Sequence, residues 1–189
     1  GIKKAISGIK MMQQSGGWFA YSSQTTKEVR YDALTGAGVL ALELMGATNS
    51  PEVRKGLNYL DARHRFNWEK PETQAPLYNW YYITQAKFHA GGKQWAQWNS
   101  SFAPGLIKSQ TVEKPAKEGD KAVGYWVPSR GMVGRFYARK NDKLYCTTLC
   151  TLMLEVYYRH LPTYKEPEEF KEEEMTGDDV DVQILIKNG

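Results

Sequence analysis

An apolar segment in the first third of the chain reads Leu34-Thr35-Gly36-Ala37-Gly38-Val39-Leu40-Ala41-Leu42-Glu43. Two later segments align with it: Asn79-Trp80-Tyr81-Tyr82-Ile83-Thr84-Gln85-Ala86-Lys87-Phe88 and Cys146-Thr147-Thr148-Leu149-Cys150-Thr151-Leu152-Met153-Leu154-Glu155. Each segment is apolar nearly all round, which is typical of a helix that is covered on both sides. The offset between them is 45 residues and then 67. This spacing predicts a helical repeat, in which each unit buries its apolar surface against its neighbours.

A more amphipathic helix is predicted before each apolar segment. The first covers about residues 2–14, where apolar residues recur at intervals of three or four. The second begins at Ser50-Pro51, because serine is a good N-cap and proline suits the first helical turn. The third covers about residues 93–110, with a break or kink expected near Pro104. An aromatic marker follows each amphipathic helix: Trp18, Trp68 and Gly124-Tyr125-Trp126.

These units predict an all-α fold of about three helical hairpins, in which outer helices cover inner ones. The helical domain is expected to span residues 1–165. The extra length of the third unit falls in Thr111 to Ala122, which is expected to be a surface loop. Residues 166–189 hold 9 acidic and 2 basic residues and form an acidic tail. The alternation of apolar residues from Val180 to Ile186 predicts one short strand within this tail.

Composition and charge exclude several classes of protein. The formal net charge of +4 combines a basic body with the acidic tail. The Lys and Arg residues are scattered singly and no nucleic-acid motif accompanies them, so no nucleic-acid partner is expected. No run of 18 apolar residues occurs, so no transmembrane segment is expected. Cys146 and Cys150 lie four residues apart in a predicted helix, where they are poorly placed for a disulfide.

Several of these residues carry a family likeness. The segment Gln14-Ser15-Gly16-Gly17-Trp18 resembles the Gln and Trp repeat of squalene cyclases and related triterpene cyclases. In that repeat the glutamine caps the next helix and the tryptophan packs over it. Gln110 with Gly124-Tyr125-Trp126 is similar to a second, stretched copy. The segments 35–45 and 145–158 resemble the inner helices of the terpenoid cyclase and protein prenyltransferase toroid.

A closer likeness joins two parts of the chain. Residues 77–98 together with 145–164 resemble the C-terminal part of bacterial proteins that carry prenyltransferase and squalene-oxidase-type repeats, whose activity is mostly unassigned. The resemblance covers about residues 5–164 and implies an α/α toroid, of which this chain is a partial ring. It also implies that the remaining hairpins come from a longer parent chain, or that the ring closes by pairing with another chain.

The resemblance implies two kinds of catalytic centre. Triterpene cyclases protonate their substrate with an Asp-x-Asp-Asp segment, and the nearest match, Asp178-Asp179-Val180-Asp181, has the wrong order and lies in the acidic tail. Prenyltransferases of this fold hold zinc with Asp, Cys and His near the starts of inner helices. Asp142, Cys146 and Cys150 could offer such ligands, but over two helical turns they span about 12 Å, too far for one ion. No cofactor is therefore expected.

Aromatic residues are the remaining candidates for ligand contact. The superfamily lines a central cavity with rings that can contact a hydrocarbon or stabilise a cation. The corresponding residues here are Trp80, Tyr81, Tyr82, Tyr145, Tyr157 and Tyr158 on the inner segments, with Trp18 and Trp126 as markers. Ordinary core packing is the alternative. The three histidines, His64, His89 and His160, stand at predicted helix ends and are interpreted as charges that complement the helix dipole.

Three functions stay open on the sequence. The preferred one is a binding or scaffold module that presents an aromatic-lined concave face to an apolar or isoprenoid ligand, or to a protein partner. The second is an enzyme that acts on isoprenoid substrates, either a terpene cyclase or a prenyltransferase. The third is a polysaccharide-active toroid enzyme, for which Asp32, Asp142 and Tyr145 would supply the catalytic groups.

Overall fold

A computed structural model describes residues 1–22, 34–71, 76–115, 117, 119, 121–128 and 142–158. These residues form six α-helices, namely α1 (Ile2–Met11), α2 (Thr35–Leu44), α3 (Pro51–Arg63), α4 (Pro76–Ala90), α5 (Gly92–Lys108) and α6 (Asp142–Leu154). A 3₁₀ turn, Glu155–Tyr157, follows α6. The strands β1 (Thr111–Glu113) and β2 (Val123–Tyr125) pair between α5 and α6. The prediction of a mainly helical chain is confirmed.

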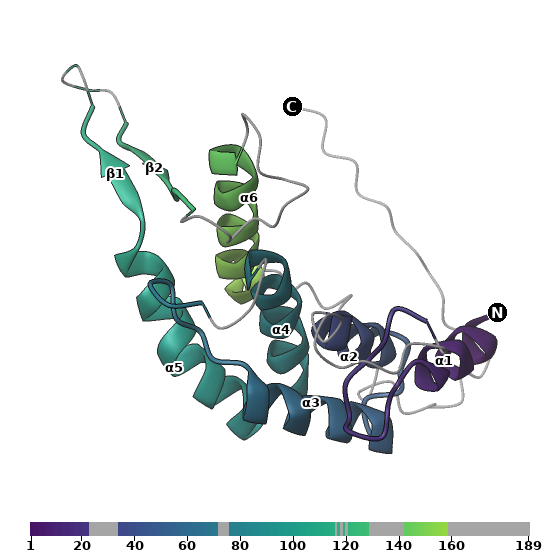
Figure 1. Cartoon of the computed structure of the whole chain (residues 1–189). Coiled ribbons are helices and arrows are strands. Elements are labelled where there is room, and N and C mark those ends of the chain that lie inside the picture. The colour runs from purple at the N-terminus through teal and green to yellow at the C-terminus, as the bar shows by residue number, and fades with distance from the viewer. Residues whose placement is uncertain are drawn as a thin grey trace, which may run out of the picture.

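The helices pack in two rows (Figure 1). Helix α2 packs on α4 and α4 packs on α6, so the three apolar segments lie side by side. Helices α1 and α3 contact α2, and α5 contacts α4. Figure 1 shows α5, α3 and α1 following one another around the outside of α6, α4 and α2. We call the first set the outer helices and the second set the inner helices; they alternate along the chain as the repeat pattern predicts.

Glycines let neighbouring helices approach closely. A Cβ atom at Gly36 of α2 would lie 2.8 Å from the backbone nitrogen of Ile83 and 3.0 Å from the carbonyl carbon of Tyr82, both on α4. A Cβ at Gly56 of α3 would lie 2.4 Å from Cγ2 of Val39 on α2. Gly36 and Gly56 therefore permit close packing of these helices.

Two apolar clusters form most of the core. The larger lies among α3, α4, α5 and α6 and is rich in rings, with the centroids of Phe66 and Trp80 4.5 Å apart. The smaller joins α1, α2 and α3 around Phe19, Val39 and Leu42. Burying one such large apolar side chain stabilises the fold by about 1.5–3 kcal/mol, so these clusters hold the two rows of helices together.

The structure corrects one expectation from the sequence and narrows another. Residues 111–122 were expected to form a surface loop, but Thr111–Glu113 pairs antiparallel with Val123–Tyr125. A break or kink was expected near Pro104; α5 continues through this residue, which excludes the break. Pro104 is exposed, whereas Phe102 and Leu106 on either side of it are fully buried and anchor both halves of the helix. The predicted strand between Val180 and Ile186 and the whole acidic tail lie outside the described residues.

The turn after α1 and the hairpin after α5 are two versions of one feature. Gln13 pairs with Phe19 in an isolated antiparallel bridge, two residues beyond the end of α1. The register of β1 and β2, extended by one pair, sets Gln110 opposite Trp126, again two residues beyond the end of the outer helix. The hairpin is thus an enlarged form of the turn in the first unit.

The same two turns bind the inner helices in the same way. The backbone N–H of Phe19 donates to Oγ1 of Thr35 at 3.1 Å, and the backbone N–H of Trp126 donates to Oγ1 of Thr147 at 3.1 Å. Thr35 and Thr147 occupy aligned positions of the first and third apolar segments. The residue that corresponds to Trp126 is therefore Phe19, and not Trp18 as the sequence marker suggested.

The amide that reaches the next outer helix belongs to Gln13. Its Nε2 donates to the backbone oxygen of Glu52, in the first turn of α3, at 2.8 Å. The resemblance had implied this role for Gln14, but Nε2 of Gln14 bonds only locally, to the backbone oxygen of Met12 at 3.4 Å.

Candidate ligand-binding face

Helix α4, the central inner helix, has two opposite faces. One face carries Trp80, Thr84 and Lys87, which contact the outer helices and the segment that joins α3 to α4. Their respective partners are the ring of Phe66, Nε1 of Trp98 and the carboxylate of Asp61. Since an α-helix turns about 100° per residue, positions 78, 82, 85 and 89 lie on the opposite side of α4. We call this side the inner face; it carries Tyr78, Tyr82, Gln85 and His89.

A cluster of tyrosines occupies the N-terminal half of the inner face. The ring centroids of Tyr78 and Tyr82 are 4.9 Å apart, and those of Tyr81 and Tyr82 are 5.0 Å apart at an interplanar angle of 76°. All three side chains are half-buried, so each ring keeps part of its surface exposed. Contacts of this kind contribute about 0.5–1.5 kcal/mol beyond burial and hold the rings in place. The cluster is therefore an ordered platform for an apolar or cationic group.

A buried amide follows the tyrosines one turn further along the inner face. Gln85 is 8% exposed, and its Nε2 has no hydrogen-bond partner among the described residues. A buried donor without a partner costs about 1–3 kcal/mol, so its presence beside the rings calls for an acceptor. An oxygen atom of a ligand or of a water molecule would satisfy it.

The three tryptophans predicted to contact a ligand lie in the core. Trp18 is 5% exposed, Trp80 is 2% exposed and Trp126 is 3% exposed. Trp126 also donates its Nε1 hydrogen to the backbone oxygen of Leu106 at 2.8 Å. Tyr145 is half-buried on α6 and packs against the same core cluster as Tyr81. The structure thus brings Tyr81 and Tyr82 together, places Tyr145 beside the same core, and uses the tryptophans for packing.

The last two predicted aromatic residues lie apart from the inner face. Tyr157 packs against α5, with its ring centroid 5.8 Å from that of Trp95 and its hydroxyl bonded to Asn99. Tyr158 is 86% exposed at the end of the described chain segment. These two rings therefore belong to a different surface from the tyrosines of α4.

The described candidates for catalysis and metal binding, Asp142, Tyr145, Cys146 and Cys150, all lie on α6. Asp142 is the first residue of α6 and is half-buried, while Asp32 lies outside the described residues. Cys146 and Cys150 are fully buried on α6. Burial, followed by the hydrogen bond to Cys146, raises the pKa of the Cys150 thiol far above its usual range. A thiol that stays protonated is a poor nucleophile and a poor metal ligand.

Among the described residues, no group of three His, Cys, Asp or Glu side chains is placed to hold a metal ion. Of the histidines, His64 follows α3 as its C-cap residue and is buried, with Nδ1 3.3 Å from Nδ2 of Asn79. His64 is therefore a buried hydrogen-bonding residue at the helix end where it was predicted. His89 lies in the last turn of α4, and His160 is outside the described residues.

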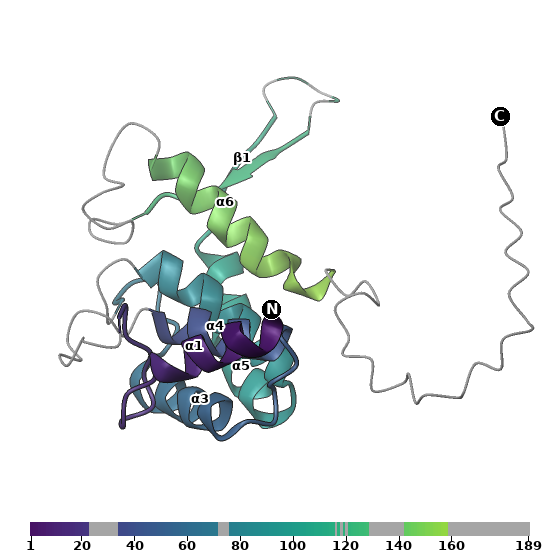
Figure 2. The same cartoon turned by 90° about the vertical axis from the view of Figure 1, so that its right-hand side faces the viewer.

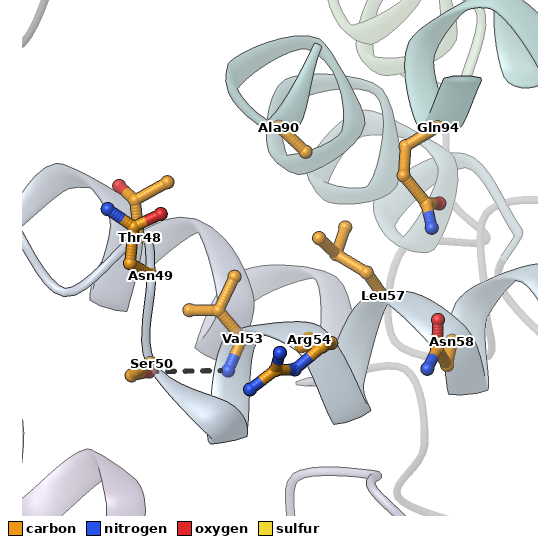
Figure 3. Close-up of a pocket in the computed structure, with 9 residues that line it drawn as sticks. All are labelled: Thr48, Asn49, Ser50, Val53, Arg54, Leu57, Asn58, Ala90 and Gln94. Carbon is orange, nitrogen blue, oxygen red and sulfur yellow. Dashed lines mark hydrogen bonds between the residues drawn. The ribbon is translucent and has the colours of Figure 1, made fainter. Parts of the chain in front are cut away.

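An open pocket of about 280 Å³ lies between α3 and the junction of α4 with α5 (Figure 3). Figure 3 shows Val53 and Leu57 of α3 and Ala90 of α4 around its apolar part, with Arg54 and Gln94 among the polar residues. A second open pocket of about 360 Å³ is lined by Phe66, Trp68 and residues of α5. The first pocket is lined by no carboxylate, histidine or cysteine. The second is lined by Glu69, Lys108 and two serines, but the hydroxyls of Ser101 and Ser109 donate to backbone oxygens of α5 and are not paired with a base. Both pockets therefore support catalysis less well than the inner face supports binding.

Comparison with known proteins does not assign this chain to a family. No family model matches it, and neither the curated proteins nor the solved structures contain a significant match. None of the helices in the described ranges is long and apolar enough to cross a membrane. The functional interpretation therefore depends on the geometry of the helices.

Proposed function

We propose that this chain is a binding module, an arc of an α/α toroid whose inner face takes up an apolar ligand that carries an oxygen atom. One observation carries the proposal. Helix α4 buries one side against the outer helices, and its other side presents contacting tyrosines next to the unpaired amide of Gln85. The family resemblance of the repeats points in the same direction.

The chemistry of the inner face favours an isoprenoid alcohol or a related molecule. The rings of Tyr78, Tyr81 and Tyr82 offer apolar surface and the negative faces of their π-systems to a hydrocarbon chain with double bonds. Nε2 of Gln85 offers a hydrogen-bond donor that lacks an acceptor. A ligand with an apolar chain and a terminal oxygen would satisfy both features at once.

The enzymatic alternatives have less support from the described residues. A prenyltransferase would need zinc, and the thiol of Cys150 is held protonated by its surroundings. A polysaccharide-active enzyme would need Asp32, which lies outside the described residues, to meet Asp142 and Tyr145. Metal analysis of the purified protein tests the first alternative directly, since stoichiometric zinc would favour a transferase over a binding module.

Titration with farnesol tests the proposed function. Binding can be followed by ¹H–¹⁵N chemical shifts of the backbone amides of α4. We expect Gln85→Met to weaken farnesol binding about tenfold, or ~1.4 kcal/mol, because it removes the only donor assigned to the ligand. The same substitution should leave the free protein as stable or more stable, since it removes a buried unpaired amide. A residue that serves packing alone would not give this opposite pair of effects.

A second variant and a matched control complete the test. Tyr78→Ala removes one ring of the platform and is expected to weaken farnesol binding. Tyr158→Ala removes a ring that is 86% exposed and lies off the inner face, so it should leave binding unchanged. The proposal fails if farnesol does not perturb α4, or if all three variants bind it as the unaltered protein does.

A further inference from the structure

The turn after α1, in the first unit, packs on the outer helix α3 of the second unit. Gln13 donates to the backbone oxygen of Glu52 on α3 at 2.8 Å. A Cβ at Gly17 would lie 2.7 Å from the backbone oxygen of Lys55, so the turn and α3 are in direct backbone contact. Gln13 and Gly17 thus both contact α3, so they lie on the same side of the turn. We call this face of the turn the seat, because the outer helix of the next unit packs on it.

A related contact joins the second unit to the third. The ring of Phe66, in the segment after α3, lies against α5 at Gly105, where a Cβ would come within 2.9 Å of the ring. In the first contact too, the next outer helix carries a glycine close to an aromatic ring, since a Cβ at Gly56 would lie 3.4 Å from the ring of Phe19. In both contacts, an aromatic turn therefore packs on an outer helix where a glycine leaves room.

The third unit has the same seat, but no described helix occupies it. By the register of the hairpin, Gln110, Val112 and Gly124 correspond to Gln13, Ser15 and Gly17. Val112 is 58% exposed, and no hydrogen bond joins the side chain of Gln110 to another of the described residues. The atoms nearest to a Cβ at Gly124 would be those of the Gln110 amide. Figure 2 shows β1 and α6 together at one end of the molecule.

At the other end of the molecule lies the outer helix α1, which packs on no such seat among the described residues. Ala5, Gly8, Ile9 and Met12 repeat the spacing of Val53, Gly56, Leu57 and Leu60 on α3. On α3 all four residues are buried, whereas α1 has no buried residue at all. A Cβ at Gly8 would meet no described atom within 4 Å, in contrast to Gly56 and Gly105. Helix α1 thus has the pattern of a seated outer helix, and no turn among the described residues contacts it at Gly8.

We propose that these two ends bind each other in different copies of the chain, so that α1 of one copy docks on the hairpin face formed by Gln110, Val112 and Gly124 of the next. The interface continues the contact that Gln13 and Gly17 make with α3 inside one chain. The amide of Gln110 gains a backbone oxygen in the first turn of α1, and the glycine of α1 admits apolar groups of the hairpin end. Such a contact is heterologous, so it yields a ring if the rotation closes and an open chain of copies if it does not.

Two substitutions block the two ends separately without entering the core. Val112→Glu puts a charge on the exposed hairpin face, and Val123→Glu is its matched control, because Val123 is 59% exposed on the opposite face of the same hairpin. Gly8→Gln fills the open position of α1, and Ser7→Gln is its control at the adjacent exposed residue. Circular dichroism shows whether each variant keeps the helical content of the unaltered chain.

Sedimentation velocity over a wide concentration range is the measurement. We expect the unaltered chain and both controls to gain mass with concentration, and Val112→Glu and Gly8→Gln each to remain monomeric. An equal mixture of the two blocked variants should form a dimer and nothing larger, because it still contains one free end of each kind.

Three results would overturn the proposal. The unaltered chain could be monomeric at every concentration, which would mean that a different protein or further hairpins occupy the seat. The blocked variants could associate as strongly as the controls. Their mixture could also stay monomeric, which would indicate that the two ends do not meet. Farnesol binding by Val112→Glu and Gly8→Gln distinguishes the two proposals. The binding proposal can hold in these variants even if the proposed association between copies is wrong.

Discussion

Gly36 offers the sharpest test of the contact between α2 and α4. An alanine at this position would place Cβ 2.8 Å from the nitrogen of Ile83 and 3.0 Å from the carbonyl carbon of Tyr82, which are backbone atoms that cannot rotate away. Gly→Ala inside a helix normally stabilises by about 0.5–1 kcal/mol, whereas forcing extra volume into a packed contact costs about 1–3 kcal/mol. Because the clash is with backbone, we expect the second effect to win and Gly36→Ala to lower the free energy of unfolding by about 1–2 kcal/mol.

Gly8→Ala is the matched control, because its Cβ would meet no described atom within 4 Å. At concentrations where the chain is monomeric, we expect it to raise the free energy of unfolding by about 0.5–1 kcal/mol through helix propensity alone. Urea denaturation, followed by far-ultraviolet circular dichroism and tryptophan fluorescence, measures both variants. If Gly36→Ala stabilises the protein as much as Gly8→Ala does, the two helix backbones do not approach as described and the reasoning is refuted.

Three further perturbations test other parts of the structure. Burial lowers the pKa of Lys87, and the ion pair with Asp61 opposes this shift. Asp61→Asn would leave the buried charge of Lys87 unpaired, so it should lower the free energy of unfolding by about 2–4 kcal/mol near neutral pH. Because the pKa of Lys87 is lower in the folded than in the unfolded protein, this loss of stability should shrink as the pH rises from the folded pKa toward the unfolded one. Urea titrations at several pH values measure both the loss and its pH dependence. An unchanged stability of Asp61→Asn would count against the ion pair. Thr84→Val leaves the Nε1 hydrogen of Trp98 without its acceptor and should cost about 1–3 kcal/mol in the same assay, while an effect near zero would indicate that the bond is absent. Cys146 and Cys150 of α6 are fully buried, and burial raises the pKa of the Cys150 thiol. Iodoacetamide should therefore label them only after unfolding, and rapid labelling of the native protein would contradict this packing.

The helices could be predicted from the sequence because their signals are local. The apolar segments are covered on both sides, and Ser50 with Pro51 marks the start of α3, where Oγ of Ser50 accepts from the backbone N–H of Val53. The hairpin was missed because its strands have three residues each and are separated by charged and proline residues. The sequence did not decide between a break and a kink at Pro104, because the continuation of α5 depends on tertiary burial of the neighbouring residues Phe102 and Leu106, which outweighs a local helix-breaking signal.

The candidate site could be predicted only in part. Tyr81 and Tyr82 were singled out as rings on an inner segment, but the sequence alone did not separate them from Trp80, one residue earlier. Which of these rings faces the core depends on the outer helices that pack on α4. Neither Tyr78 nor Gln85 was predicted from the sequence as a ligand-binding residue. The signal that could have found them is the spacing 78, 82, 85, which sets one face of α4 against Trp80 and Lys87 on the other.

A nuclear Overhauser spectrum of the whole chain tests the two-row packing most directly. We expect cross-peaks between the α-protons of Gly36 and the amide proton of Ile83, which join two inner helices. We also expect cross-peaks between the ring of Phe66 and the α-protons of Gly105, which join the segment after α3 to the next outer helix. If Gly36 shows no contact with α4, or if Phe66 contacts a helix other than α5, the inner and outer rows do not exist in this order.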